Sequence, residues 1–188
     1  MKNAILLHGM PSKEEYYSEK YPSASNSHWF PWLQKQLLIH DVFAATPEVP
    51  LPFDLQWDRW AKEVERYAIT PETILVGHSC GAGFWVRYLS EHRELRVGKV
   101  ILVAPWIDVE KEDPNHFFDF TIDPDLASRT KGLVIINSSD DSETVQLSVT
   151  KLRDKLQDAK YVEFEGKGHF TLKSLGTAEF PELLTELV

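Results

Sequence analysis

Short apolar runs alternate along the chain with segments in which apolar residues recur at helical spacing. The runs are bounded by glycine, histidine or polar residues, and they span residues 4–7, 41–45, 74–76, 100–103, 133–136 and 161–164. Apolar runs of this length, separated by segments long enough for a helix, are typical of a parallel β-sheet covered by helices. The pattern therefore predicts an α/β fold with about six mostly parallel strands.

Helical spacing is clearest in two segments between these runs, and Asp54 is placed to cap the first of them. The apolar faces consist of two sets of residues: Leu55, Trp60, Val64 and Tyr67, and Val145, Val149, Leu152 and Leu156. We interpret both faces as core contacts, because a stripe of this kind usually packs against a sheet. The final stretch, 178–188, predicts a helix that closes the sheet.

Two connections are longer than the others. Residues 11–27 are polar and contain tyrosines, so we expect them to form a mobile rim at one end of the sheet. Residues 105–131 carry Trp106, Phe117, Phe118 and Phe120 among many acidic residues. This segment predicts either a small cap over the same end of the sheet or a helix with one buried aromatic face. In both cases its aromatic residues would lie near the strand ends.

Composition indicates the number of domains, the partners that the charge disfavours and the compartment. The 188 residues are 43% hydrophobic, enough for one domain over 1–188 with a substantial core. A net charge of −9 opposes binding to nucleic acid and to anionic membranes. The single cysteine, Cys80, fits a reducing compartment, and the first residues, 1–9, lack the features of a signal peptide. No apolar run is long enough to cross a bilayer, so we expect a soluble cytoplasmic protein.

The stretch Gly77-His78-Ser79-Cys80-Gly81 follows one apolar run and precedes a helical pattern. This G-x-S-x-G spacing between a strand and a helix is the arrangement of a nucleophile elbow. The two glycines relieve crowding on the sharp turn, and the start of the helix favours negative charge beside Ser79. The alternative is a glycine-rich turn in which Ser79 only caps the helix.

A serine hydroxyl needs a base to activate it and an acid to orient that base. In this arrangement the triad follows the chain order serine, acid, histidine. Asp140 and Asp141 follow the run 133–136, and His169 follows the last run. Because the carboxyl ends of parallel strands meet at one edge of a sheet, we expect Ser79, one aspartate and His169 to converge there.

An oxyanion hole would use the backbone N–H of Cys80, the residue after the nucleophile, and one N–H from the loop after the first run. In that loop Pro11 has no N–H, so Met10 is the better donor. His8 has no partner pattern typical of a metal site, and we expect no metal and no cofactor. His78 is interpreted as a packing residue at the elbow rather than as a second base.

The chain resembles small serine hydrolases of the α/β-hydrolase fold, the family of retinoblastoma-binding protein nine and its compact bacterial relatives. The similarity covers nearly the whole length through these motifs: Leu7-His8-Gly9, His28-Trp29-Phe30-Pro31-Trp32-Leu33, Gly77-His78-Ser79-Cys80-Gly81, Asn137-Ser138-Ser139-Asp140-Asp141 and Gly168-His169-Phe170. It implies a compact fold that lacks the first two strands of larger hydrolases. It also implies that Asp141 is the triad acid and that Asp140 supports the turn, although the proline usual after the second acid is absent here.

These observations predict a carboxylesterase-like serine hydrolase that acts through an acyl-enzyme on small or medium esters, or on amides. The catalytic residues would be Ser79, Asp141 and His169, and aromatic residues of 105–131 would form an apolar pocket. One alternative is a protein-interaction module that keeps the fold with little or no turnover. Another is an acyltransferase that uses the same triad, and an unidentified protein partner stays open in each case.

Overall fold

The computed structural model describes residues 2–188. The strands are β1 Lys2–Leu7, β2 Val42–Ala45, β3 Ile74–His78, β4 Val100–Val103, β5 Leu133–Ser138 and β6 Lys160–Phe164. The α-helices are α1 Lys13–Tyr17, α2 Phe30–Ile39, α3 Trp57–Val64, α4 Cys80–Glu91, α5 Glu143–Lys155, α6 Leu172–Leu175 and α7 Pro181–Leu187. Two short 3-10 turns, η1 Ala24–Asn26 and η2 Leu126–Arg129, complete the elements of the described residues.

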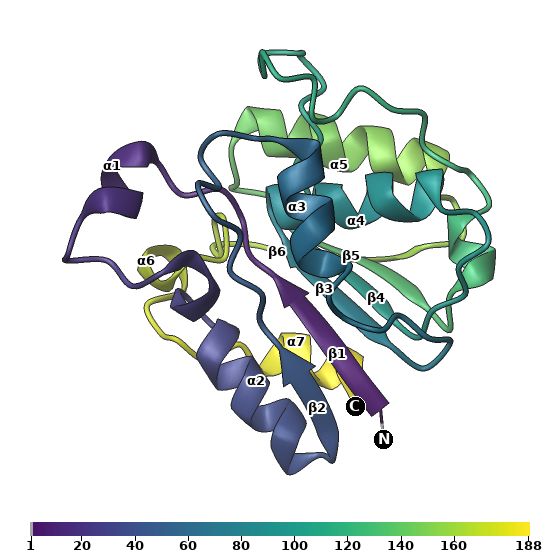
Figure 1. The fold of residues 1–188 in the computed structure, drawn as a ribbon, viewed down its shortest axis with the longest axis horizontal. Coiled ribbons are helices and arrows are strands. Elements are labelled where there is room, and N and C mark those ends of the chain that lie inside the picture. The colour runs from purple at the N-terminus through teal and green to yellow at the C-terminus, as the bar shows by residue number, and fades with distance from the viewer. Residues whose placement is uncertain (1) are drawn as a thin grey trace.

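The six strands form one sheet in the order β2-β1-β3-β4-β5-β6, and every neighbouring pair is parallel. The predicted α/β fold is therefore confirmed. Helices α2 and α7 lie on one face of the sheet and α3, α4 and α5 on the other (Figure 1). The register aligns Leu7 with Gly77 and Val103 with His78, so β1, β3 and β4 end at the same edge of the sheet.

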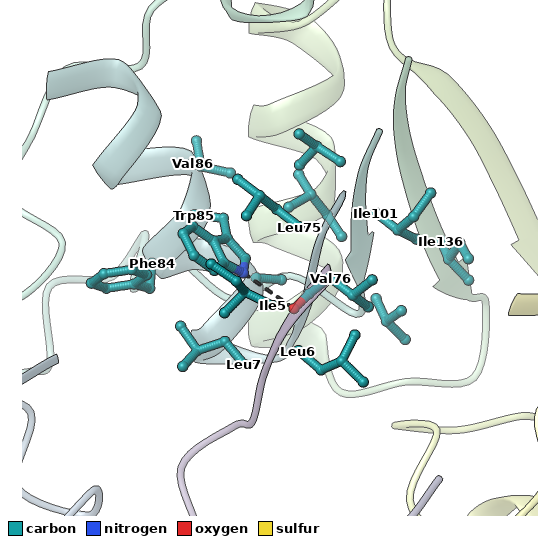
Figure 2. Packing of buried hydrophobic residues seen from close by; sticks show 14 of the residues in the cluster. Ile5, Leu6, Leu7, Leu75, Val76, Phe84, Trp85, Val86, Ile101 and Ile136 are labelled. Carbon is teal, nitrogen blue, oxygen red and sulfur yellow. Dashed lines mark hydrogen bonds between the residues drawn. The ribbon is translucent and has the colours of Figure 1, made fainter. Parts of the chain in front are cut away.

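The core lies between the sheet and both helical layers. The central strands β1, β3, β4 and β5 are buried along nearly their whole length, as expected for strands with both faces covered. Figure 2 shows Ile5 and Val76 of these strands beside Trp85 of α4, and Ile101 and Ile136 close to one another further across the sheet. Full burial of a valine, isoleucine or phenylalanine side chain stabilises the fold by about 1.5–3 kcal/mol.

Three local expectations for the helices were wrong. Asp54 does not cap α3, which begins after Gln56 without a side-chain cap, because the Asp54 carboxylate instead binds Arg59 at 3.2 Å. Leu55 lies before α3 and Tyr67 lies beyond its end at Val64, although both still pack against the core. The last helix begins at Pro181 rather than near 178, since proline fits best in the first turn of a helix.

Residues 105–131 form neither of the two expected structures. Within this range only η2 is helical, and the rest consists of turns, bends and irregular backbone apart from a single bridge at Thr130. Phe117 is fully buried and packs against Trp57 and Trp60 of α3, with ring centroids 5.7 and 5.4 Å apart. Phe117 therefore completes the core beside α3 and α4, whereas Trp106 lies close to the end of β3, where its N–H donates to the Ser79 carbonyl at 3.1 Å.

Candidate active site

Ser79 stands on a sharp turn between β3 and α4. Its φ of 56° and ψ of −123° lie in a region that side chains rarely adopt. A Cβ on Gly77 would lie 2.5 Å from backbone atoms of Ala82, and a Cβ on Gly81 would lie 2.3 Å from the carbonyl oxygen of His8. Both positions thus require glycine. The Ser79 side chain makes no capping hydrogen bond to α4, so the capping alternative has no support in the structure.

Backbone hydrogen bonds hold this strained turn. The Ser79 N–H donates to the carbonyl of Val103 at 2.9 Å, and the Ser79 carbonyl accepts from the N–H of Trp106 at 3.1 Å. The same carbonyl accepts from Gly83 in the first turn of α4. Cys80, next in the chain, is fully buried, and burial raises the pKa of its thiol well above the usual value. A buried protonated thiol is a poor nucleophile, which favours the Ser79 hydroxyl over the Cys80 thiol as the candidate nucleophile of the elbow.

The sequence prediction brings Ser79, an aspartate and His169 together, and the structure places Asp141 against His169. The His169 Nδ1 lies 2.8 Å from the Asp141 Oδ2, and the Asp141 side chain is only 3% exposed. An ionised carboxylate only accepts hydrogen bonds, so Nδ1 carries the proton and Nε2 keeps a lone pair. Ser79 and His169 both line the same cavity. The imidazole and a buried carboxylate are thus in contact, and the Ser79 hydroxyl lies on the same cavity, beyond the ends of β3, β5 and β6.

Asp140 has a different environment from its neighbour. Its Oδ1 accepts hydrogen bonds from the Ser138 hydroxyl at 2.5 Å, from the Gly166 N–H at 3.0 Å and from the Gly168 N–H at 3.2 Å. These donors, the Ser138 hydroxyl first, lower the pKa of Asp140. Asp140 therefore ties the end of β5 to the loop that carries His169. The geometry favours Asp141 as the partner of the imidazole.

The loop after β1 approaches the nucleophile closely. A Cβ on Gly9 would lie 3.0 Å from the Cβ of Ser79, so a side chain there would crowd the serine. Among residues 2–188, neither the Met10 N–H nor the Cys80 N–H donates to another group. Both amides are therefore available to a negatively charged oxygen beside Ser79, as an oxyanion hole requires.

His8 orients the first of these amides. Its Nε2 accepts a hydrogen bond from the Val49 N–H at 3.0 Å, so the proton is on Nδ1, which donates to the Gly9 carbonyl at 2.7 Å. Burial lowers the pKa of His8 and keeps the ring neutral. In a trans peptide the C=O and the next N–H point in opposite directions. The bond from His8 therefore turns the Met10 N–H away from His8.

A cavity of about 920 Å³ opens at Ser79, within the size range of small-molecule sites. The predicted rim 11–27 contributes to it, as do residues after β1, β3 and β6. Its lining consists of His8, Gly9, Met10, Pro11, Glu15, Tyr16, Tyr21, Pro22, Ser23, Ala24, Ser27, His28, Glu48, His78, Ser79, His169, Thr171, Leu172 and Lys173. No residue of 105–131 takes part, so the expectation that aromatic residues of this segment form an apolar pocket was wrong.

Sequence reasoning missed several members of this lining. Tyr16 of α1 and Leu172 of α6 stand on two short helices that lie on the same side of the molecule, beyond the end of β1 (Figure 1). Glu48 supports the rim, because its carboxylate accepts hydrogen bonds from the Ser25 N–H at 2.8 Å and the Ala24 N–H at 3.3 Å. The available signal was the tyrosine content of 11–27. Nothing in the apolar pattern connects that segment to the residues after His169.

Among residues 2–188, no group of three or more His, Cys, Asp and Glu side chains is arranged to hold a metal ion. In the same residues, no helix has the length and apolar character needed to cross a membrane.

Comparison with known proteins identifies the family to which the chain belongs. A family model described as serine hydrolase matches residues 20–187. The chain belongs to this serine hydrolase family. It is 32% identical over 180 residues to YdeN of Bacillus subtilis (strain 168), a match that covers 90% of this chain and 92% of that protein.

One solved structure agrees with the family membership and a second shares the fold. The crystal structure of the ydeN gene product from B. subtilis superposes with a TM-score of 0.82 at 25% identity, covering 100% of this serine hydrolase and 97% of that chain. Est1E from Butyrivibrio proteoclasticus with ferulic acid bound superposes at 0.63 with 13% identity, covering 100% and 86%. The second likeness concerns the fold alone. The protein is thus a serine hydrolase of the α/β-hydrolase fold.

Proposed function

We propose that this serine hydrolase cleaves carboxylic esters of small or medium size through an acyl-enzyme on Ser79. The observation that carries the proposal is the 2.8 Å contact between the His169 Nδ1 and the buried Asp141 carboxylate, with Ser79 on a strained elbow in the same cavity. This contact fixes the tautomer in which Nε2 can accept the serine proton. Asp141 also stabilises the imidazolium that then forms.

The first half-reaction transfers the acyl group to the enzyme. As the Ser79 Oγ attacks the carbonyl carbon, its proton moves to the His169 Nε2 and the carbonyl oxygen becomes negative. The backbone N–H groups of Met10 and Cys80 donate to this oxygen. The intermediate then collapses, the bond to the leaving alcohol breaks, and Nε2 returns the proton to that alcohol.

The second half-reaction regenerates the enzyme. A water molecule gives its proton to the His169 Nε2 and attacks the acyl carbon, and the same two amides stabilise the negative oxygen. When the bond to Ser79 breaks, the serine oxygen takes the proton back and the carboxylic acid leaves. Amide substrates would follow the same steps, with an amine as the leaving group.

The cavity supports the choice of substrate class. Its volume suits a small or medium molecule, and Met10, Tyr16, Tyr21 and Leu172 offer apolar or aromatic surface on its walls. The lining contains two carboxylates, those of Glu15 and Glu48, and one ammonium group, that of Lys173. We therefore expect uncharged esters to react faster than esters with an additional negative group.

The test is covalent labelling with a fluorophosphonate probe combined with nitrophenyl ester hydrolysis. The wild-type protein should react at Ser79 and turn over esters, whereas Ser79→Ala and His169→Ala should lose both activities while they stay folded. A folded wild-type protein that neither reacts with the probe nor hydrolyses any member of an ester series from acetate to decanoate would refute the proposal. Competition between water and added alcohols measures any acyl transfer.

A further inference from the structure

The loop that carries His169 has an unusual backbone on both sides of the imidazole. Gly168 has a φ of +50° and Phe170 a φ of +52°, in the left-handed region that residues with a side chain rarely adopt. Phe170 is nevertheless fully buried and stacks on Phe180, with ring centroids 5.2 Å apart. A strained turn of this kind persists only where surrounding contacts fix it.

Three ring nitrogens provide those contacts, and none of them belongs to the triad. The His78 Nε2 lies 2.7 Å from the carbonyl oxygen of His169, and the Trp29 Nε1 donates to the carbonyl of Phe170 at 3.1 Å. The N–H of Leu172 donates to the Nδ1 of a third ring, His28, at 3.1 Å. Backbone groups at 169, 170 and 172 are thus each bound by a ring from a distant part of the chain.

The chemistry of the partners fixes both histidine tautomers. A carbonyl only accepts, so the His78 Nε2 must carry a proton, and the His28 Nδ1 must be free to accept from an N–H. Burial, first among the causes, lowers the pKa of both rings, so both are neutral near neutral pH. A neutral His28 keeps the lone pair that the Leu172 N–H needs.

The rings themselves have little freedom to move. Trp29 is fully buried, stacks on Phe30 with centroids 4.2 Å apart, and meets the ring of Phe180 edge-on at 6.1 Å. His78 is 3% exposed and lies at the end of β3, immediately before the nucleophile. The contacts therefore connect the His169 loop to the elbow on one side and to the start of α2 on the other.

We propose that Trp29 and His78, assisted by His28, are positioning residues that hold the His169 imidazole in register with Ser79 and Asp141. This inference rests on the proposed function, because it assigns a role to groups that act through the general base. It also gives a physical role to the His28-Trp29 pair, whose part in the site the sequence leaves open. An imidazole misplaced by about 1 Å would lower the rate by about 100-fold.

Trp29→Phe tests the first contact. This change keeps an aromatic ring and removes only the indole N–H. The matched control is Trp85→Phe, since Trp85 is also fully buried and donates one N–H to a backbone carbonyl, that of Val76, at 3.1 Å (Figure 2). Both variants should lose thermal stability to a similar degree. Only Trp29→Phe should lower kcat, by about 10- to 100-fold, with KM within about twofold of wild type.

His78 allows a rescue experiment. His78→Phe removes the donor to the His169 carbonyl and should lower kcat to a similar extent. The amide nitrogen of a glutamine reaches about as far as a histidine Nε2, so His78→Gln should recover most of the activity. Proton NMR supplies a second measurement, since the downfield resonance of the Nδ1–H shared by His169 and Asp141 should broaden or shift in Trp29→Phe and His78→Phe but stay unchanged in Trp85→Phe.

The outcomes separate this inference from the function on which it rests. A wild-type protein without ester turnover or Ser79 labelling would overturn the proposed function itself. An active wild type in which Trp29→Phe loses no more activity than Trp85→Phe would overturn the positioning role and leave the triad intact. Equal activities of His78→Phe and His78→Gln, with an unchanged shared-proton resonance, would also overturn it.

Discussion

Replacement of Asp141 by asparagine is the sharpest test of the triad. The substitution keeps the shape of the side chain and removes its negative charge. In the structure the carboxylate contacts the His169 Nδ1 at 2.8 Å and is almost completely shielded from water. The wild-type charge therefore acts on the imidazolium at short range in the transition state, and the variant lacks this interaction.

The size of the effect follows from that geometry. Opposite charges about 4 Å apart at an effective dielectric constant of about 20 attract by about 4 kcal/mol. A loss of that size from the transition state lowers the rate about 1000-fold. The side-chain amide of the Asp141→Asn variant would in addition favour the tautomer with the proton on Nε2, where it cannot accept the serine proton, so the total loss could reach about 10,000-fold.

The matched control is Asp140→Asn. Asp140 uses one oxygen, Oδ1, to accept from Ser138, Gly166 and Gly168, and an asparagine oxygen can accept the same bonds. We expect a loss below about 10-fold. The assay compares kcat/KM for nitrophenyl acetate and the rate of fluorophosphonate labelling, with thermal unfolding to verify the fold. An Asp140→Asn variant that loses three orders of magnitude while Asp141→Asn stays within tenfold would refute the assignment.

Three further predictions concern the elbow, the oxyanion hole and the response to acid. Gly81→Ala should destabilise the fold by more than about 3 kcal/mol and abolish labelling, because its Cβ would overlap the His8 carbonyl at 2.3 Å; denaturant unfolding measures this loss. His8→Leu should lower kcat about 10- to 100-fold with little change in KM, measured by steady-state kinetics, since the Met10 N–H loses its orientation. Burial lowers the pKa of His8 and His78, so below about pH 6.5 the unfolded chain binds protons that the folded chain does not. The free energy of unfolding should therefore fall as pH decreases from 7 to 5, and His78→Gln should reduce that slope.

The sequence by itself determined the six strands in their order along the chain and the positions of Ser79 and His169. Parallel strands buried on both faces produce apolar runs. Gly77 and Gly81 mark a sharp turn at positions where no side chain fits. Both features are local and visible in the sequence. The same is true of His169, which follows the last strand in a glycine-rich loop. Local signals of this kind identified the α/β fold.

Only the tertiary structure decided which of two adjacent aspartates contacts His169, because Asp140 and Asp141 differ in direction and not in sequence environment. It also decided which connection lines the cavity. Phe117 of the segment 105–131 packs on α3 and α4 and no residue of that segment lines the cavity, whereas the polar segment 11–27 contributes to the lining. The contacts of Trp29 and His78 with the His169 loop join residues more than 90 positions apart. Such contacts depend on how the layers pack, and no local pattern records them.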